Sequence, residues 1–285
     1  MTGFDPGPAF FRRSVGDGAE ILQPLPASAS GWSPDQIRGM AVSGALARAT
    51  ERTAGQVMPQ MQPARWAVDL FRPARVRPTS VRTTVVRHGR RIGLIDAQLC
   101  QEGRPVARSR ALFARPSPTP DGQVWQPEHT LPGPPPDLVP TGDDPRLFYS
   151  QQQGWTTGTD PHRNGSHKQV WHLPITLVAG ERPTPFQMIA GVADLASLVV
   201  NWGASGVEFI NADIDLVLTR LPMSSEVGLS AVDRSEGNGI AVGTAVVFDR
   251  DGPLGSASVV ALGNPVSGVD PGNRSPDLSA FHGGH

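Results

Sequence analysis

The sequence predicts an α+β protein that uses one plan twice, a long apolar helix followed by an antiparallel sheet. Three observations predict this fold class. Two apolar stretches have the spacing of a buried helix, a run of strand-like segments follows each of them, and three short motifs recur at a nearly constant offset. Recurrence of this kind indicates an internal duplication.

The duplicated motifs keep their order along the chain. The pattern Ser/Thr-Pro-x-Gln, which is typical of a helix start, occurs at 33–36 and at 184–187, 151 residues apart. Predicted hairpin turns at 101–103 and 250–252 are 149 residues apart. The third pair has the same offset of 149 residues and consists of 71–73 and 220–222. We therefore expect two copies of one small domain.

In the first half, residues 10–24 are expected to form one or two strands around a Gly-Asp-Gly turn at 16–18, and a helix is expected from about Pro34 to about Arg52. Strands follow, with the alternation that is typical of an antiparallel sheet with one wet face. They are expected at 64–72, 80–87, 91–100 and 105–114.

The apolar stretch at residues 184–201 is the clearest helix of the second half. Thr184 suits the N-cap, Pro185 suits the first turn, and Gln187 completes a capping box. Apolar side chains then recur at spacings of three and four, which predicts burial on most sides. The remaining polar stripe consists of Gln187, Gly191, Asp194, Ser197 and Asn201. Asp194 is the one carboxylate of the stripe, and it is either a satisfied structural group or a functional one.

The chain is divided by residues 116–145, which contain ten prolines and are expected to be an extended linker. On either side lie a first domain at 8–115 and a second domain at 146–263, and a disordered tail is expected at 264–285. Strands of the second domain are expected at 147–153, 169–175, 207–221, 227–234, 240–249 and 254–261.

A sheet wrapped around one apolar helix is the hotdog architecture. Two units in one chain predict a tandem (double) hotdog, in which the sheets form one continuous surface of roughly twelve strands. Because such a chain already supplies the pair of domains that single hotdogs make by association, the minimum functional unit is one chain. We expect a monomer or a homo-oligomer.

Composition excludes several classes of function. The chain has 285 residues, of which 38% are hydrophobic and 18% charged, and its net charge is −1 with no run of like charge. Nothing therefore indicates a nucleic-acid partner. No segment has the roughly 20 apolar residues of a membrane span, and one cysteine, Cys100, rules out an internal disulfide. A cytoplasmic protein is expected.

Five segments carry a family likeness. The first half contains VDLFRP at 68–73, VVRHGRR at 85–91 and QEGRPVA at 101–107, and the second half contains FINADI at 209–214 and FDRDG at 248–252. Together with Asp194 in its helix, these segments resemble the two hotdog domains of the type II acyl-CoA thioesterases. The likeness covers about residues 10–262.

The resemblance implies hydrolysis of an acyl-CoA in lipid metabolism, without a metal, without a cofactor and without a covalent nucleophile from Cys100. A helix aspartate of this family acts with a glutamine and a serine or threonine to orient water, and Asp194 stands at that aspartate. Counted from the turn at 250–252, the glutamine position is Val260. The hydroxyl position falls near Ser235, and Asn211 is a further candidate for the catalytic set.

Substrate contacts are expected from Gly39, from Val260 and from the arginine-rich turn with Arg87, Arg90 and Arg91. Arginine forks suit the phosphate oxygens of CoA. Equally, that turn can be simply solvated. Two histidines of the loop 160–167 have no carboxylate or thiolate partner at metal-ligand spacing, so no metal site is predicted.

Two other functions stay open from the sequence. The valine at 260 favours a non-catalytic or weakly active acyl-CoA-binding hotdog protein, because valine cannot hydrogen-bond water or a carbonyl. An enoyl-CoA hydratase is a third possibility, which the lack of an Asp/His pair on either helix disfavours.

Overall fold

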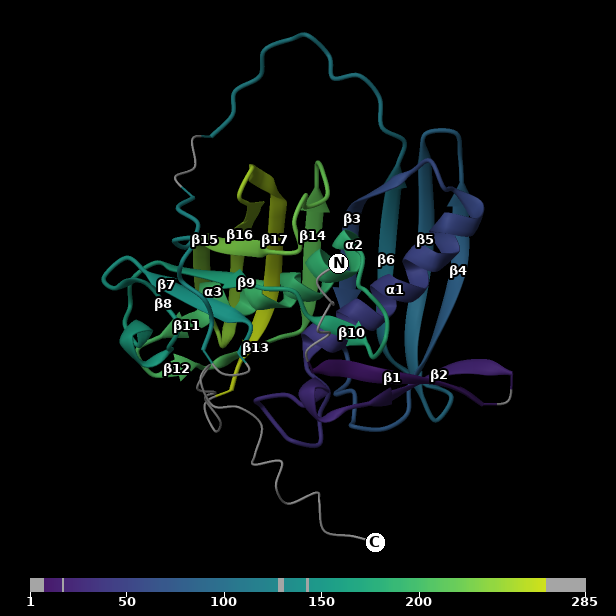
Figure 1. Cartoon of the computed structure of the whole chain (residues 1–285), viewed down its shortest axis with the longest axis horizontal. Coiled ribbons are helices and arrows are strands. Elements are labelled where there is room, and N and C mark those ends of the chain that lie inside the picture. Colours follow the sequence, from purple (N-terminus) through teal and green to yellow (C-terminus); the bar gives the residue numbers. More distant parts are fainter. Residues whose placement is uncertain (1–7, 17, 128–130, 142–143, 265–285) are drawn as a thin grey trace, which may run out of the picture.

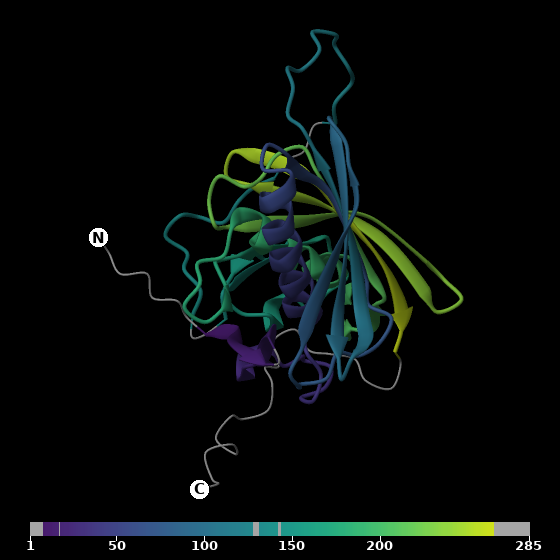
Figure 2. The ribbon, with the colours of Figure 1, turned by 90° about the vertical axis from the view of Figure 1, so that its right-hand side faces the viewer.

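The two halves of the chain share one large sheet that packs around their helices (Figures 1 and 2). The computed structural model describes residues 8–16, 18–127, 131–141 and 144–264. The large sheet has twelve strands, and its order is β4-β5-β6-β3-β14-β17-β16-β15-β9-β7-β8, with β13 also paired to β17. The prediction of a tandem hotdog with one continuous sheet is confirmed.

The first half opens with a hairpin, which leads through a short helical turn to the long helix α1 and then to four antiparallel strands. Its elements are β1 (Ala9–Gly16), β2 (Ala19–Pro24), η1 (Pro26–Ser28), α1 (Gly39–Val57), β3 (Gln62–Asp69), β4 (Ser80–His88), β5 (Ile92–Gln101) and β6 (Arg104–Ala114). Of the one or two strands expected at 10–24, both are present and pair as a hairpin, although residue 17 of its turn lies outside the described residues.

The second half repeats the plan with a broken helix and additional short strands. Its elements before the helix are β7 (Arg146–Ser150), β8 (Gly154–Thr156), η2 (Asp160–His162), β9 (Lys168–His172) and β10 (Thr176–Val178). The helical segment consists of α2 (Pro185–Val192), η3 (Ala193–Leu195) and α3 (Ala196–Asn201). The strands after it are β11 (Trp202–Gly203), β12 (Gly206–Val207), β13 (Phe209–Asn211), β14 (Asp213–Leu218), β15 (Val227–Gly237), β16 (Ile240–Asp249) and β17 (Gly252–Gly263). The tail from residue 265 onward lies outside the described residues.

Strand pairing joins the described parts of the two halves at two places. In the large sheet, β3 pairs antiparallel with β14 from Asp69↔Asp213 to Arg65↔Val217. In a separate three-stranded sheet, β1 of the first half pairs parallel with β10 of the second. One hydrophobic core extends through both halves and includes Trp66, Phe186 and Val247.

The first helix begins later than the sequence motif indicates, so the expected start at Pro34 is wrong. Residues 33–36 form a turn that pairs with the loop after β3, through the bridge Gln36↔Arg75 and the bond from the Val76 N–H to the Asp35 oxygen. Helix α1 begins only at Gly39. The two hairpin turns used to detect the duplication, β5–β6 and β16–β17, are confirmed.

The second helix begins where it was predicted, but it is not continuous. The Gln187 N–H donates to the Thr184 Oγ1 at 3.2 Å, which confirms the N-cap. The Gln187 side chain donates to Glu51 of α1 instead of closing the capping box. At Ala193–Leu195 the helix tightens into a 3₁₀ turn, and this turn contains Asp194.

Helices α1 and α2 approach each other closely at small residues. The Ser43 hydroxyl donates to the Ala190 carbonyl at 2.6 Å and accepts from the Trp66 indole at 2.9 Å. A Cβ on Gly191 would lie 3.2 Å from the Met40 carbonyl oxygen. This contact fixes the first turn of α1 against the segment that leads to Asp194.

Part of the proline-rich linker covers the outer face of the sheet. Leu131 and Leu138 pack on a second apolar cluster that includes Trp171 and Phe248. The Trp155 indole donates to the Pro132 carbonyl at 3.0 Å. The chain between 116 and 127 arches away from the body (Figure 1), so the linker is a free span only over its first part.

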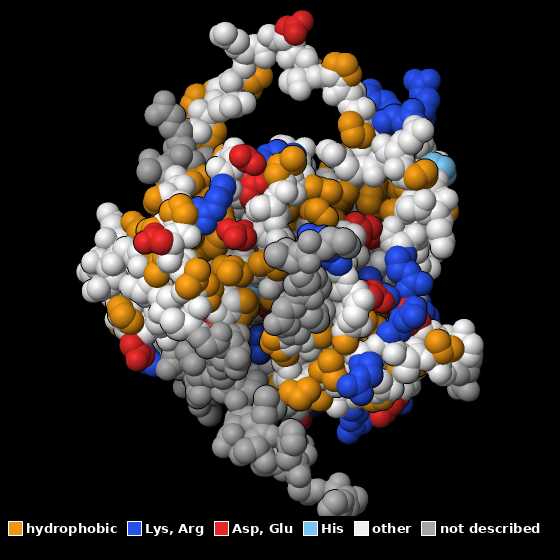
Figure 3. Space-filling view, viewed as in Figure 1, with side chains coloured by type: hydrophobic (Ala, Val, Ile, Leu, Met, Phe, Trp, Pro, Cys, Tyr) orange, Lys and Arg blue, Asp and Glu red, His pale blue; other side chains and the backbone are white. Residues whose placement is uncertain are grey.

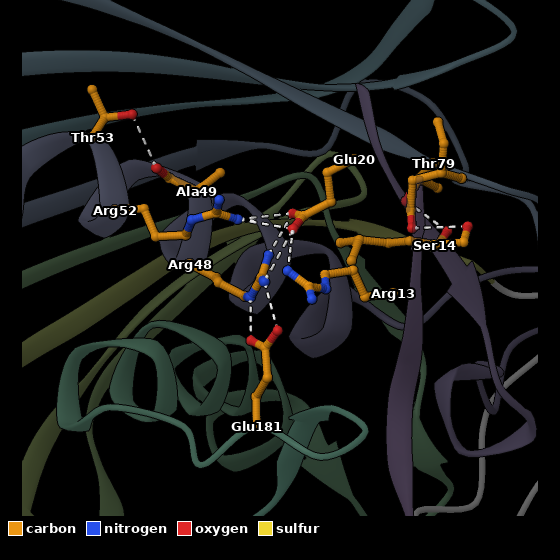
Figure 4. A network of polar contacts seen from close by, with 11 residues as sticks. Arg13, Ser14, Glu20, Arg48, Ala49, Arg52, Thr53, Thr79 and Glu181 are labelled. Atoms are coloured by element: carbon orange, nitrogen blue, oxygen red, sulfur yellow. Dashed lines mark hydrogen bonds and ion pairs between the residues drawn. The ribbon is translucent and has the colours of Figure 1, made fainter. Parts of the chain in front are cut away.

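A charged network ties α1 to both halves (Figure 4). The buried Arg48 guanidinium pairs with Glu20 of β2 at 2.6 Å and with Glu181, just before α2, at 2.7 Å. Arg52 adds a second contact to Glu20 at 2.9 Å. On the face that Figure 3 shows, charges of both signs are interspersed, and neither forms a continuous field. Among the described helices, none is long and apolar enough to cross a bilayer.

Candidate active site

A cavity of about 1160 Å³ lies where the two halves meet. Its wall takes residues from the start of β1, from the loop before α1 and the first turn of α1, from the loop after β3, from the end of β9, from η3 and α3, and from β13. Most of these side chains are apolar. The polar groups in the wall include Asp194, Asn211, Arg38 and His172.

Asp194 projects from the 3₁₀ turn onto the first turn of α1. A Cβ on Gly39 would lie 2.3 Å from the Asp194 Oδ1 and 2.9 Å from its Oδ2, which is far inside contact distance. Position 39 therefore requires glycine for reasons of space. The carboxylate takes the place of a side-chain N-cap, because the N-cap residue of α1, Arg38, makes no capping bond.

Asn211 also holds the Asp194 carboxylate. Its Nδ2 donates to the Asp194 Oδ1 at 2.9 Å and to the Asp213 carbonyl at 3.3 Å. Asn211 ends the short strand β13, which pairs with the last residues of β17 (Asn211↔Ala261). The structure therefore brings together three of the residues that the sequence singled out, Asp194, Asn211 and Gly39.

Burial raises the pKa of Asp194 above the ordinary range of an aspartate. The hydrogen bond from Asn211, the backbone N–H of Met40 and the positive charge of Arg38 lower the pKa in part, and burial outweighs them. A carboxylate with a raised pKa is a stronger base than an exposed one. The site thus places a carboxylate of raised pKa on the wall of a mostly apolar cavity.

The first turn of α1 also supplies a free donor. Within the described part of the chain, no carbonyl or side chain accepts the N–H of Gly39. The first N–H groups of a helix lack intrahelical partners and lie at the positive end of its dipole. This donor can therefore bind an oxygen that becomes negative next to Asp194.

Ser235 and Val260 lie away from this group. Ser235 is exposed on β15, opposite Val242 of β16, and is absent from the cavity wall. Val260 is 37% exposed, whereas its neighbours Val259 and Ala261 are buried. Since successive side chains of a strand face opposite sides, residue 260 points to the outer face of the sheet. Neither residue therefore lies where its expected role requires, and neither side chain can act on Asp194.

A bulge explains the error at residue 260. Leu254 faces the core, and strict alternation would bring 256, 258 and 260 to the same side. The pairing of β17 with β16 shifts register beside Leu254, and the residues that face the core after it are Ala257, Val259 and Ala261. A count from the turn cannot detect such a shift.

The turn with Arg87, Arg90 and Arg91 lies at the opposite end of α1. Gly93, just after this turn, packs against Met58 and Met61, which follow the last residue of α1. A helix of 19 residues is about 28 Å long, so the turn is remote from Gly39 and Asp194. None of the three arginines lines the cavity.

Several residues of the wall were missed by sequence reasoning. Burial lowers the pKa of His172 to about 4, so its imidazole is neutral, and its Nδ1 contacts the Leu173 carbonyl at 2.5 Å. Arg38 donates twice to the Ala29 carbonyl and lies over the Phe10 ring. Neither belongs to a recognisable motif, and their places in the cavity wall arise from the tertiary fold. Among the described residues, no three His, Cys, Asp or Glu side chains gather as metal ligands.

Sequence comparison matches each half of the chain to a known domain family. Residues 28–114 match the acyl-CoA thioesterase N-terminal domain, and residues 119–262 match the acyl-CoA thioesterase C-terminal domain. No curated protein sequence matches the chain significantly.

Solved structures share the fold at low identity. The TesB protein of Mycobacterium avium subsp. paratuberculosis is 18% identical, with a TM-score of 0.62 over 86% of this chain and 92% of that one. The acyl-CoA thioesterase II TesB2 of Mycobacterium marinum is 17% identical, with a TM-score of 0.61 over 88% and 94%. A hot dog protein of Alicyclobacillus acidocaldarius is 16% identical, with a TM-score of 0.62 over 88% and 95%. From the two domain matches, in the order and at the places where the duplication was found, it follows that the chain belongs to the acyl-CoA thioesterase family.

Proposed function

We propose that the protein hydrolyses acyl-CoA thioesters to a free acid and CoA, with Asp194 as the base that activates water. The observation that carries this proposal is the contact of Asp194 with Asn211 and with the first turn of α1, on the wall of a large and mostly apolar cavity. The family assignment supports a thioester as the substrate.

The reaction follows from the chemistry of these groups. The water oxygen bonds to the thioester carbonyl carbon while one water proton passes to the Asp194 carboxylate. The carbonyl oxygen becomes an oxyanion, then the carbon–sulfur bond breaks and the thiolate of CoA leaves. That thiolate recovers the proton from Asp194, so the enzyme returns to its starting state.

The free N–H of Gly39 is the donor for the oxyanion in this proposal. It requires no movement, because the start of α1 is fixed against α2 by the bond from Ser43 to Ala190 and by the close approach of Met40 to Gly191. A preorganised donor of this kind acts most strongly where water is excluded.

Asn211 positions the base. Its Nδ2 occupies the Asp194 Oδ1, which directs the other carboxylate oxygen toward water. Asn211 thereby fills the supporting role that the resemblance assigns to a glutamine and a hydroxyl residue. Val260 and Ser235 take no part.

A second function, acyl-CoA binding without turnover, is favoured by one observation. Asp194 caps α1, and its carboxylate is held by Asn211 and Met40, so it has a structural reason to exist without catalysis.

Hydrolysis of a panel of acyl-CoAs of increasing chain length, followed with a thiol reagent, separates the two functions. Wild-type protein should release CoA, and Asp194→Asn should slow release by about 10²-fold or more while acyl-CoA binding is retained. Asp121→Asn, at an exposed linker position, is the matched control. Tight binding with background turnover for every chain length would establish the binding function instead.

A further inference from the structure

The mouth of the cavity carries an exposed aromatic ring beside an unpaired guanidinium. Phe71 and Arg72 follow β3 in the loop 70–76, and both line the cavity. Phe71 is 48% exposed. In the part of the chain that the structure describes, no acceptor or carboxylate pairs with the Arg72 side chain.

The backbone of this loop is fixed on both sides. The Leu70 N–H donates to the Ala212 carbonyl, next to Asn211, and the Arg72 N–H donates to Val106. Farther along, the buried Gln101 amide bonds both the N–H and the carbonyl of Arg75, at 2.9 and 2.7 Å. Phe71 and Arg72 are thus held at the mouth on a rigid support, which reduces the entropy that a ligand would have to remove.

The other arginines of the cavity are already engaged. Arg38 donates to the Ala29 carbonyl at 3.0 and 2.7 Å. Arg146 forms a two-pronged pair with Asp144 at 2.8 and 2.9 Å. A ligand anion would have to displace these bonds, whereas Arg72 can bind it at once. The cavity therefore offers its accessible positive charge at the mouth, on the same loop as the exposed ring.

We propose that Phe71 and Arg72 form the subsite for the nucleotide end of CoA, with the ring stacked on the adenine and the guanidinium on a phosphate. Aromatic rings stack on bases of every kind, and the arginine fork matches phosphate oxygens. This subsite rests on the proposed function and adds to it the residues that hold the nucleotide of the acyl-CoA substrate. A thioester of a carrier protein lacks the adenine and would leave the ring of Phe71 without a partner.

Binding of two unreactive probes tests the subsite without turnover. Free CoA carries the nucleotide, and pantetheine lacks it. By calorimetry, Arg72→Ala and Phe71→Ala should each raise the Kd for CoA about tenfold, and Phe71→Tyr, which keeps the ring, should stay near wild type. Arg82→Ala, at an exposed position of β4 outside the cavity wall, is the matched control. Unchanged CoA binding in both alanine variants would overturn the proposal.

Kinetics provide a second readout. Arg72→Ala should raise KM for an acyl-CoA about tenfold with kcat nearly constant, and should leave the same acyl group on pantetheine unaffected. An equal loss with both substrates would show that the loop acts on the acyl or pantetheine part, and a wild-type preference for acyl carrier protein over acyl-CoA would also overturn the subsite. If the wild-type protein hydrolyses none of these thioesters, the proposed function fails, and the CoA and pantetheine titrations still decide the subsite.

Discussion

Each half of the molecule sends a carboxylate to the start of the other half's helix, and the two junctions differ. At α1, Asp194 lies on Gly39 and borders the large cavity. At α2, Glu51 accepts from the Thr184 hydroxyl at 2.9 and 2.7 Å and from the Gln187 amide at 2.7 Å. At both helix starts, a carboxylate from the other half of the molecule thus contacts the first turn or the N-cap residue. Glu51, however, is absent from the cavity wall.

The difference extends to the tenth residue of each helical segment. That residue is Arg48 in α1 and Asp194 in the segment that begins at Pro185. Arg48 is buried, and its guanidinium forms ion pairs with both Glu20 and Glu181 (Figure 4). The duplication therefore produced one junction that is closed by an ion network and one that opens on a cavity. We infer that the closed junction stabilises the fold and the open one performs the chemistry.

The largest effect on the open junction, apart from loss of the base itself, is expected from Gly39→Ala. The new Cβ would lie 2.3 Å from the Asp194 Oδ1, so the carboxylate or the first turn of α1 must shift. Because displacement of a catalytic group by about 1 Å can cost 10²-fold, kcat should fall by roughly that factor. Gly55→Ala, at a position of α1 where a Cβ meets nothing, should retain full activity. Normal turnover in Gly39→Ala would show that the contact between Asp194 and α1 is dispensable.

Arg48→Met is expected to weaken the closed junction. The change leaves Glu20 and Glu181 without their buried partner, which would cost several kcal/mol in a fully buried site. Both glutamates are partly exposed, so we expect a loss of about 2 kcal/mol in the free energy of unfolding. Urea unfolding measures it. The kcat of the folded variant should remain close to wild type, and a large fall in kcat would contradict the division between the junctions.

The pH dependence of the reaction should show the burial of Asp194. Activity requires the ionised carboxylate, so kcat/KM should fall with decreasing pH through the pKa of Asp194 in the free enzyme. Because burial raises that pKa, the acid limb should lie above the ordinary aspartate value of about 3.9. A rate profile over the acid range, at constant ionic strength, checks this. An acid limb at or below the ordinary value would exclude Asp194 as the titrating base.

Val260→Gln should have the smallest effect. Its side chain faces outward from β17, so a glutamine there cannot reach Asp194 or its water. We expect unchanged kcat and KM in steady-state assays with an acyl-CoA. An increase in kcat would show that β17 adopts another register in solution.

Local patterns predicted much of this molecule. The hairpin turns at 101–103 and 250–252 and the strands around them lie close to their expected positions, because turn residues and alternation are local properties. Asp194 was recognisable as the one carboxylate on an apolar helix. The helix start at Pro34 failed because the tertiary bridge between Gln36 and Arg75 overrides a local cap signal.

The remainder of the site depends on contacts that local patterns do not contain. Gly39 is required by the position of a carboxylate that lies 155 residues later in the chain. Val260 was misplaced because a bulge beside Leu254 reverses the faces of β17. Arg72 stands out only after the other arginines of the cavity are found to be paired. These properties depend on the tertiary structure, and they cannot be predicted from the spacing of residues in the sequence.

Asp194→Asn and Glu51→Gln, measured side by side for acyl-CoA hydrolysis and thermal unfolding, test the division of roles most directly. Asp194 has a raised pKa in the folded state, so its ionised form opposes folding as the pH rises. Asp194→Asn should therefore lose about 10²-fold or more in kcat with a Tm at neutral pH that is equal to wild type or higher. Glu51→Gln should keep its kcat with a Tm that is equal to wild type or lower. Full activity in Asp194→Asn, or a comparable loss in Glu51→Gln, would contradict the account.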